Sequence, residues 1–522
     1  MNWKRPLALS TAALTLGTAL AACGNPTAAA PDPTPTPAAE VQSLSTTGST
    51  VKAPKYVFLF IGDGMSYPQI QSTADYLGAL EDADYWQAEP SLDDNQGAKL
   101  DGPEYLNFMN FEAAGSAVTY DSNSFAPDSA STATSISTGY KTYSGSINVD
   151  ETGTISYETI AEQLHAQKGY SVGVITSVNL NHATPAAFYA HQASRNDYYD
   201  IGLELIDSGF EYFAGGGLLK PTGAEGDQAD LYALAEKAGY HVVKTQAEAE
   251  QVTGGPVVII DEHLADSDAM AYEIDRTDDM WALADYVEKG IEVLSQDKDG
   301  FFMMCEGGKI DWACHANDAA STIHDTQALA DAVQVAIDFA KEHADETLIL
   351  VTGDHETGGL TIGFAGTDYD TYLDLLESQK ISYAKFDSDY VSRYKEDKTS
   401  FEDVLKDVEA LFGLKPQGEE GDKLVLTDYE LEQLRAAYEK SVNGTAASQY
   451  EQEEYVLYGT YEPLSVTLTH IINNKSGISF TSYSHTGLPV AVLAHGVNAG
   501  QFNGYYDNTQ IYHKLAGMLG IA

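Results

Sequence analysis

The segment from Phe301 to His315, FFMMCEGGKIDWACH, decides the fold prediction for this chain. Its first four residues are apolar, which predicts a short buried strand. The strand leads into Glu306, and the two glycines that follow allow a sharp turn. Asp311 and His315 then have a spacing that places both side chains on one face of a helix. Two carboxylates and an imidazole meeting past a strand end suit Zn²⁺, or Mg²⁺ at an all-oxygen position. The alternative is a plain strand, turn and helix with an Asp–His pair on the surface.

Further apolar runs of strand length lie on both sides of this segment. They are residues 56–61, 171–176, 347–353 and 490–494. Asp63 follows the first run almost at once, Asp354 and His355 follow the third, and His485 precedes the last. In α/β proteins, ligands gather at the carboxyl ends of parallel strands. These four side chains are therefore site candidates, although each alone also fits an ordinary turn.

Helical patterns alternate with these strands, which predicts an α/β fold with a mostly parallel sheet. We expect the core domain to comprise residues 55–365 and 481–522. Residues 366–480 are rich in Tyr and acidic side chains, contain helical patterns at 401–412 and 427–442, and are predicted to be a large insertion.

The first 54 residues predict export and anchoring rather than folded structure. Residues 1–22 carry Lys4 and Arg5 before an apolar run, as a secretory signal does. The sequence Leu-Ala-Ala-Cys ending at Cys23 looks like a bacterial lipobox, in which the cysteine is lipidated and begins the mature chain. The alternative is an ordinary signal with an incidental cysteine. Residues 24–54 are rich in Pro, Thr and Ala and predict a flexible tether that follows Cys23.

Composition excludes some functions. The chain has 522 residues and a formal net charge of −50, which argues against nucleic acid as a partner because phosphate-backbone binding needs a basic surface. Besides Cys23 there are two cysteines, Cys305 and Cys314, which could form one disulfide but are no disulfide framework.

Two further segments contain side chains suited to an anion. Pro127 and the Ser- and Ala-rich residues after it predict a helix start with Ser129 in the first turn, where the helix dipole and free N–H groups favour negative charge. Further on, a loop is expected to enter a helix at Pro185, with Arg195 near the end of that helix. Arginine binds phosphate or carboxylate through two parallel hydrogen bonds. The alternatives are a helix cap for Ser129 and a helix-terminal charge for Arg195.

Taken together, these side chains supply ligands, a nucleophile and an anion clamp for phosphoryl transfer at a metal cluster. At this point the sequence resembles the alkaline phosphatase family over most of residues 55–520. The motifs that carry the resemblance, in the family's order, are Gly62-Asp63-Gly64, Asp128-Ser129-Ala130, His182-Ala-Thr184-Pro185, Arg195, Glu306-Gly-Gly-Lys-Ile-Asp311, His315, Gly353-Asp354-His355 and His485-Thr-Gly487.

The resemblance implies a three-layer sandwich and three metal ions per subunit. One Zn²⁺ would be held by Asp311, His315 and His485. A second Zn²⁺ would take Asp63, Asp354 and His355, and a Mg²⁺ would take Asp63, Thr184 and Glu306. Ser129 would be the nucleophile that forms a phosphoserine intermediate, Arg195 would clamp the phosphoryl group, and Asp128 would help to position Arg195.

The resemblance also implies a homodimer that hydrolyses phosphate monoesters outside the cytoplasm for phosphate scavenging, with the insertion as a cap or crown. Two positions vary within the family: His182 stands where some bacterial members have Asp, and Trp312 where they have Lys. This combination resembles marine bacterial enzymes, with Trp312 as a wall of the phosphate pocket and His182 near the magnesium. The alternatives are a diester, phosphonate or sulfate-ester hydrolase of the same superfamily, and a binding lipoprotein without activity.

Overall fold

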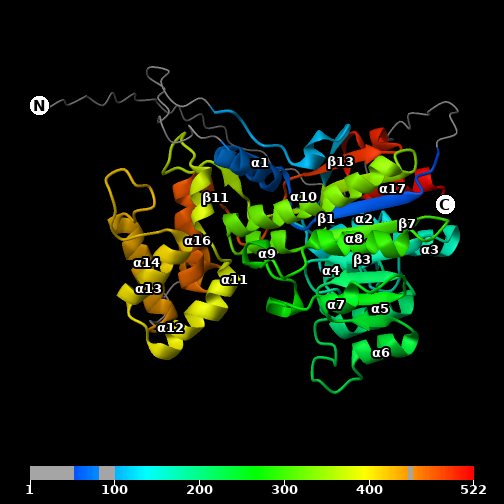
Figure 1. Ribbon diagram of the computed structural model, residues 1–522, viewed down its shortest axis with the longest axis horizontal. Coiled ribbons are helices and arrows are strands. Elements are labelled where there is room, and N and C mark those ends of the chain that lie inside the picture. Colours follow the sequence, from blue (N-terminus) through cyan, green and yellow to red (C-terminus); the bar gives the residue numbers. More distant parts are fainter. Residues whose placement is uncertain (1–51, 82–99, 445–450, 522) are drawn as a thin grey trace, which may run out of the picture. The chain divides into compact units, whose positions relative to one another are not determined.

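The computed structural model describes residues 52–81, 100–444 and 451–521 (Figure 1). The predicted signal, Cys23 and nearly all of the predicted tether lie outside these residues. Ten strands form one sheet, in the spatial order β14-β2-β13-β8-β1-β7-β3-β4-β6-β5. Their bounds are β1 Tyr56–Gly62, β2 Ala113–Val118, β3 Ser171–Thr176, β4 Tyr212–Gly215, β5 His241–Val243, β6 Val257–Ile260, β7 Phe301–Gly307, β8 Thr347–Gly353, β13 Val490–Gly496 and β14 Gly504–Asp507.

The sheet is mostly parallel, as predicted. Neighbouring strands pair in parallel throughout except at β13, which is antiparallel to both β8 and β2. Four short strands form two separate two-stranded ribbons: β9 Glu356–Thr357 with β12 His485–Thr486, and β10 Thr361–Ile362 with β11 Ile478–Ser479.

Helices cover both faces of the sheet. Alternate side chains of a strand such as β1 point to opposite faces, and because those of β1 are apolar on both faces, both need to be covered. Val57, Leu59 and Ile61 belong to one hydrophobic core, while Tyr56, Phe58 and Phe60 belong to another. The core helices are α1 Tyr67–Glu81, α2 Ser129–Thr138, α3 Ile160–Lys168, α4 Ala183–Ala186, α5 Tyr198–Ser208, α6 Leu231–Ala238, α7 Gln246–Ala249, α8 Leu283–Leu294, α9 Lys309–His315, α10 Ala319–Glu342 and α17 Thr509–Leu519. The arrangement is the predicted three-layer α/β sandwich.

The described part of residues 366–480 contributes no strand to the large sheet and gathers its helices to one side of it (Figure 1). These helices are α11 Tyr383–Phe386, α12 Ser392–Asp397, α13 Phe401–Phe412, α14 Asp428–Ser441, α15 Glu451–Tyr458 and α16 Pro463–Ser476. All of them except α15 share a third hydrophobic core, which also takes in Tyr76 of α1 and Ile323 of α10. This shared core attaches the segment firmly to the sandwich.

Two details differ from expectation. Arg195 does not lie near the end of a helix, because α4 ends at Ala186 and Arg195 lies in a turn before α5. Cys305 and Cys314 are both buried free thiols, so the disulfide alternative is wrong. Among the described residues, no helix combines the length and the apolar character needed to cross a membrane.

Candidate active site

Ser129 is the first residue of α2, at the end where the backbone N–H groups are free. Asp128 caps this helix, and its carboxylate accepts a hydrogen bond from the Ser131 N–H at 3.1 Å. The Ser129 side chain is buried, with Oγ at 3.5 Å from Oδ1 of Asp63 and 3.2 Å from Nε2 of His355. The hydroxyl therefore combines the positive end of a helix with a neighbouring cluster of polar groups.

Strand register places Asp63 beside Asp354. β1 and β8 are parallel neighbours with Gly62 opposite Gly353, so the residue after each glycine emerges at the same point of the sheet edge. His355 joins them, with Nε2 at 3.3 Å from a carboxylate oxygen of each. The donor atoms of these three side chains all lie within 4.8 Å of one another, close enough for one metal ion.

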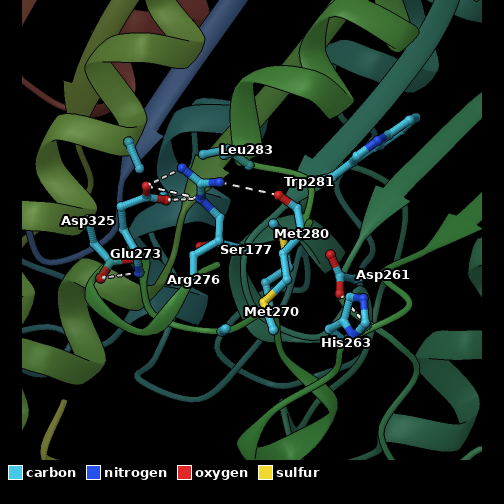
Figure 2. A pocket seen from close by; sticks show the side chains of 13 residues that line it. Ser177, Asp261, His263, Met270, Glu273, Arg276, Met280, Trp281, Leu283 and Asp325 are labelled. Carbon is cyan, nitrogen blue, oxygen red and sulfur yellow. Dashed lines mark hydrogen bonds and ion pairs between the residues drawn. The ribbon is translucent and has the colours of Figure 1, made fainter. Parts of the chain in front are cut away.

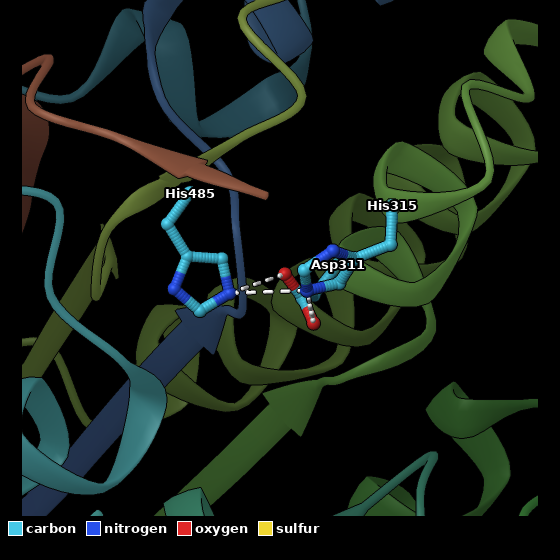
Figure 3. Close-up of side chains that lie close together, drawn as sticks. All are labelled: Asp311, His315 and His485. Carbon is cyan, nitrogen blue, oxygen red and sulfur yellow. Dashed lines mark hydrogen bonds and ion pairs between the residues drawn. The ribbon is translucent and has the colours of Figure 1, made fainter. Parts of the chain in front are cut away.

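A second donor group consists of Asp311, His315 and His485 (Figure 3). Asp311 and His315 share one face of α9, as their spacing predicts, and β12 brings His485 to them from far along the chain. Nδ1 of His315 lies 2.6 Å from the Tyr483 carbonyl, and Nδ1 of His485 lies 2.5 Å from the Pro127 carbonyl. A carbonyl accepts only from a proton donor, so each Nδ1 carries hydrogen and the two Nε2 atoms face each other at 3.1 Å. When both rings are neutral, each presents an Nε2 lone pair at this point, and a cation between the rings fits both.

A third donor group joins Asp63 to Glu306 and His182. Glu306 ends β7 beside β1, and its Oε2 accepts a hydrogen bond from the Thr176 hydroxyl at 2.5 Å. Its other oxygen, Oε1, is buried without a hydrogen-bond partner among the described residues, and so is Nδ1 of His182. Thr184 is also present, since its hydroxyl donates to Asp63 Oδ2 at 3.0 Å. An unpartnered buried carboxylate oxygen at this place fits a cation.

His182 has two possible roles that exclude each other. Its Nε2 lies 3.0 Å from Nη2 of Arg195, which only donates, so in this arrangement Nε2 is the acceptor and Nδ1 carries the hydrogen. Binding of a metal through Nδ1 would put the hydrogen on Nε2 and break the contact with Arg195. Sequence reasoning placed Thr184 in this group and His182 only near it, whereas the structure brings both side chains to Asp63.

The buried carboxylates repel one another in the absence of cations. Burial, and then the nearby Asp354 and Asp311 carboxylates, raises the pKa of Asp63 well above its ordinary value. Burial raises the pKa of Glu306 to about 8 and, with the help of Asp311, that of Asp354 to about 6. Bound metal ions would remove this penalty by supplying the missing positive charge.

Three of the four imidazoles are prepared as neutral donors; for the fourth, His315, burial lowers the pKa but the Asp311 carboxylate outweighs it and raises the pKa overall. Burial lowers the pKa of His355 and of His485 to about 4, and the pKa of His182 to about 3. At neutral pH these rings are uncharged, which is the form that binds metal ions.

Arg195 is held by Asp128, whose Oδ2 lies 2.9 Å from Nη1. Burial raises the pKa of Asp128, but the Arg195 charge and the Gly145 N–H outweigh it, so the pKa is lowered overall. One carboxylate therefore caps the helix that carries Ser129 and positions the guanidinium.

These groups open into one cleft of about 440 Å³, a size typical of small-molecule sites. The side chains that line it include Ser129, Arg195, Asp311, Trp312 and His485. Two tyrosines of the predicted insertion, Tyr383 and Tyr461, also line this cleft, and no sequence motif marked them.

A second polar hollow nearby is not a substrate site. Figure 2 shows Arg276 between Glu273 and the Met280 carbonyl, at 2.7 Å and 3.2 Å, with Asp325 at the edge. Its volume of about 20 Å³ holds roughly one water molecule. The cleft lined by Ser129, Arg195 and the ligand candidates Asp311, His315 and His485 is the candidate active site because of its chemistry.

Sequence reasoning assigned no role to Glu356, although it lies within the motif that contains His355. Its buried carboxylate accepts hydrogen bonds from Gln69 at 2.8 Å, from the Gly359 N–H at 3.1 Å and from the Thr486 hydroxyl. The bond from Thr486 joins the segment after β8 to the segment that carries His485, and the bond from Gln69 joins it to α1. Its position next to His355 was the one feature of the sequence that could have marked Glu356 as a site residue.

The fold and the three donor groups define an α/β protein with a candidate metal-binding active site. Comparison with known proteins agrees. The family model for alkaline phosphatase matches residues 54–521. Alkaline phosphatase 3 of Bacillus subtilis is 31% identical over 469 residues, which cover 88% of this chain and 87% of that protein.

Solved structures show the same resemblance. A cold-active alkaline phosphatase from a Shewanella species is 28% identical, with a TM-score of 0.69 over 89% of this chain and 99% of the other. Thermus thermophilus alkaline phosphatase, 24% identical, shares the fold with a TM-score of 0.71 over 90% and 92% of the two chains. The chain belongs to the alkaline phosphatase family, and it is an enzyme that hydrolyses phosphate monoesters with the help of metal ions.

Proposed function

We propose that this enzyme transfers the phosphoryl group of a monoester to Ser129 and then to water, through a phosphoserine intermediate. The position of the hydroxyl at the start of α2, 3.2 Å from a histidine with a low pKa, supports this role. Anionic charge that develops on Oγ is stabilised by the helix N-terminus.

The observation that carries the metal proposal is the pair of Nε2 atoms of His315 and His485, which face each other at 3.1 Å beside Asp311. We assign one Zn²⁺ to these two rings with Asp311, and a second to Asp63, Asp354 and His355. Mixed nitrogen and oxygen donors are the ligands that zinc prefers. When bound, the ions would neutralise the phosphoryl oxygens and the leaving oxygen.

The third site would take Mg²⁺ at Asp63, Glu306 and Thr184. This all-oxygen set suits magnesium. In this assignment His182 keeps its contact with Arg195, and the unpartnered Oε1 of Glu306 faces the ion.

The remaining residues act on the substrate directly. Arg195 clamps two phosphoryl oxygens, because a guanidinium presents paired donors. Asp128 keeps the guanidinium aligned with the end of α2. Positioning and charge neutralisation are the main demands of phosphoryl transfer.

Activity toward p-nitrophenyl phosphate and its bis-ester tests this function, measured with and without a chelator and together with metal analysis. We expect preferred cleavage of the monoester, loss of activity on chelation, and two zinc ions and one magnesium ion per chain. Preferred cleavage of the diester would contradict the proposal.

We also propose export and anchoring through a lipid on Cys23, with the enzyme facing the periplasm or cell exterior as a homodimer that scavenges phosphate. The basic start, the apolar run and the Leu-Ala-Ala-Cys sequence support the anchor. Cys23→Ser should release the enzyme from membranes, and continued membrane association would contradict the anchor.

Light scattering of the full chain and of a chain lacking residues 366–480 tests the dimer and the contribution of the insertion.

A further inference from the structure

One side of the cleft consists of aromatic side chains that have no role in phosphoryl transfer itself. Tyr383 of α11 and Tyr461, just before α16, line it together with Trp312. The two tyrosine rings meet edge to face, with centroids 5.6 Å apart. All three aromatic side chains are half-buried, so each keeps surface open toward the cleft.

This wall is held rigidly by core residues. Both oxygens of Asp275 accept from Ser382, one from its N–H at 3.0 Å and one from its hydroxyl at 2.5 Å. Asp318, which caps α10, accepts from the Tyr383 N–H at 3.0 Å. Two buried carboxylates of the sandwich thus fix the first turn of α11, and with it the Tyr383 ring.

The polar ends of the ring system are also fixed. The Tyr272 hydroxyl lies 3.1 Å from the Tyr383 hydroxyl, and Lys309 places its ammonium over the Tyr272 ring at 3.8 Å and over the Trp312 ring at 4.6 Å. Lys309 is itself fully buried and paired with Asp266 at 2.8 Å. The Tyr383 and Trp312 rings are therefore pre-organised, which reduces the entropy lost when a ligand stacks on them.

We propose that Tyr383, Tyr461 and Trp312 form a subsite for a planar aromatic leaving group, and that nucleoside monophosphates are the preferred class of substrate. Stacking on aromatic side chains tolerates every base, because each base has a π-face. The wall lies in the same cleft as Ser129 and Arg195, so one ester can reach both. This inference rests on the proposed monoesterase function and specifies its substrate.

The test compares AMP with ribose 5-phosphate, which share the same leaving oxygen and differ by the base. We expect the wild-type enzyme to prefer AMP by about tenfold in kcat/KM, the size of one good stacking contact. Tyr383→Leu and Tyr461→Leu keep apolar bulk but remove the rings, and each should lower the AMP to ribose 5-phosphate ratio about three- to tenfold. Tyr429→Leu, at an exposed position of α14, is the matched control and should keep the wild-type ratio.

The outcomes are separable. A wild-type ratio near one, or a ratio that both Leu variants preserve, would overturn the aromatic subsite while leaving the monoesterase function intact. Failure of the wild-type enzyme to hydrolyse either ester would overturn both. Inhibition by inorganic phosphate, measured in each folded variant, reports on the phosphoryl end of the site and should change less than the substrate ratio.

Discussion

The guanidinium of Arg195 lies 2.9 Å from the carboxylate of Asp128, 67 positions earlier in the chain. The other oxygen of that carboxylate accepts from the N–H groups of Ser131 and Gly145, so a single side chain connects the helix that carries Ser129 to the phosphate clamp.

Asp128→Asn should weaken phosphate binding while α2 remains capped, because asparagine is also a good N-cap. Loss of the ion pair frees the Arg195 side chain, and we expect KM for monoesters and Ki for inorganic phosphate to rise about tenfold, or ~1.4 kcal/mol. Steady-state kinetics measure both constants. Unchanged values would show that Asp128 does not position Arg195.

Glu356→Gln should destabilise the site without touching Ser129. An amide nitrogen would face donors that now point at a carboxylate oxygen, at a cost of about 1–3 kcal/mol in the free energy of unfolding. We also expect weaker zinc retention, because the side-chain bond from Thr486 that supplements the β9–β12 pairing between the segments of His355 and His485 is weakened. Thermal unfolding and metal analysis measure the two effects, with Glu420→Gln, at an exposed position, as the control. A wild-type melting temperature and full zinc content would contradict this role.

His191 gives the enzyme a pH-dependent contribution to stability near the Arg195 turn. Burial lowers the pKa of His191, but hydrogen bonds to Glu162 and Glu204 outweigh it and raise the pKa to about 10. The unfolded value is about 6.5. The stabilisation is therefore complete below pH about 6.5, as long as the carboxylates stay ionised, and is lost as the pH rises toward 10.

His191→Gln should accordingly lower the free energy of unfolding by about 1–2 kcal/mol at pH 6 and by much less at pH 10. Denaturant titrations at the two pH values measure the difference, and the exposed His241→Gln serves as the control. A loss of unfolding free energy that grows with pH would contradict the stabilising role of His191.

Metal removal should lower stability as well as activity. Without cations, buried carboxylates including Asp63, Glu306 and Asp354 repel one another. We expect a chelator to lower the melting temperature by on the order of 10 °C, and added zinc and magnesium to restore it. An unchanged melting temperature in metal-free protein would contradict the assignment of these donor groups as metal ligands.

Much of the fold follows from local patterns in the sequence. The apolar runs at 171–176 and 347–353 coincide with β3 and β8, since a strand buried on both faces must be apolar throughout. The Asp311–His315 spacing likewise predicted one helical face, and the Pro127 signal predicted Ser129 at the start of α2.

What escaped prediction depends on contacts between distant segments. Tyr383 reaches the cleft because Asp275 and Asp318 of the sandwich anchor α11, which no local pattern records. His182 reaches Asp63 and Glu306 through the register of neighbouring strands. Arg195 lies in a turn because α4 ends after a single turn of helix.

The most direct test of the account is to trap the phosphoenzyme. Wild-type enzyme quenched during turnover of p-nitrophenyl phosphate should carry one phosphoryl group on the peptide that contains Ser129, detected by mass spectrometry. Ser129→Ala, with its metal content near that of the wild type, should carry none and lose nearly all activity. A phosphoryl group on another residue, or normal turnover by Ser129→Ala, would contradict the central claim.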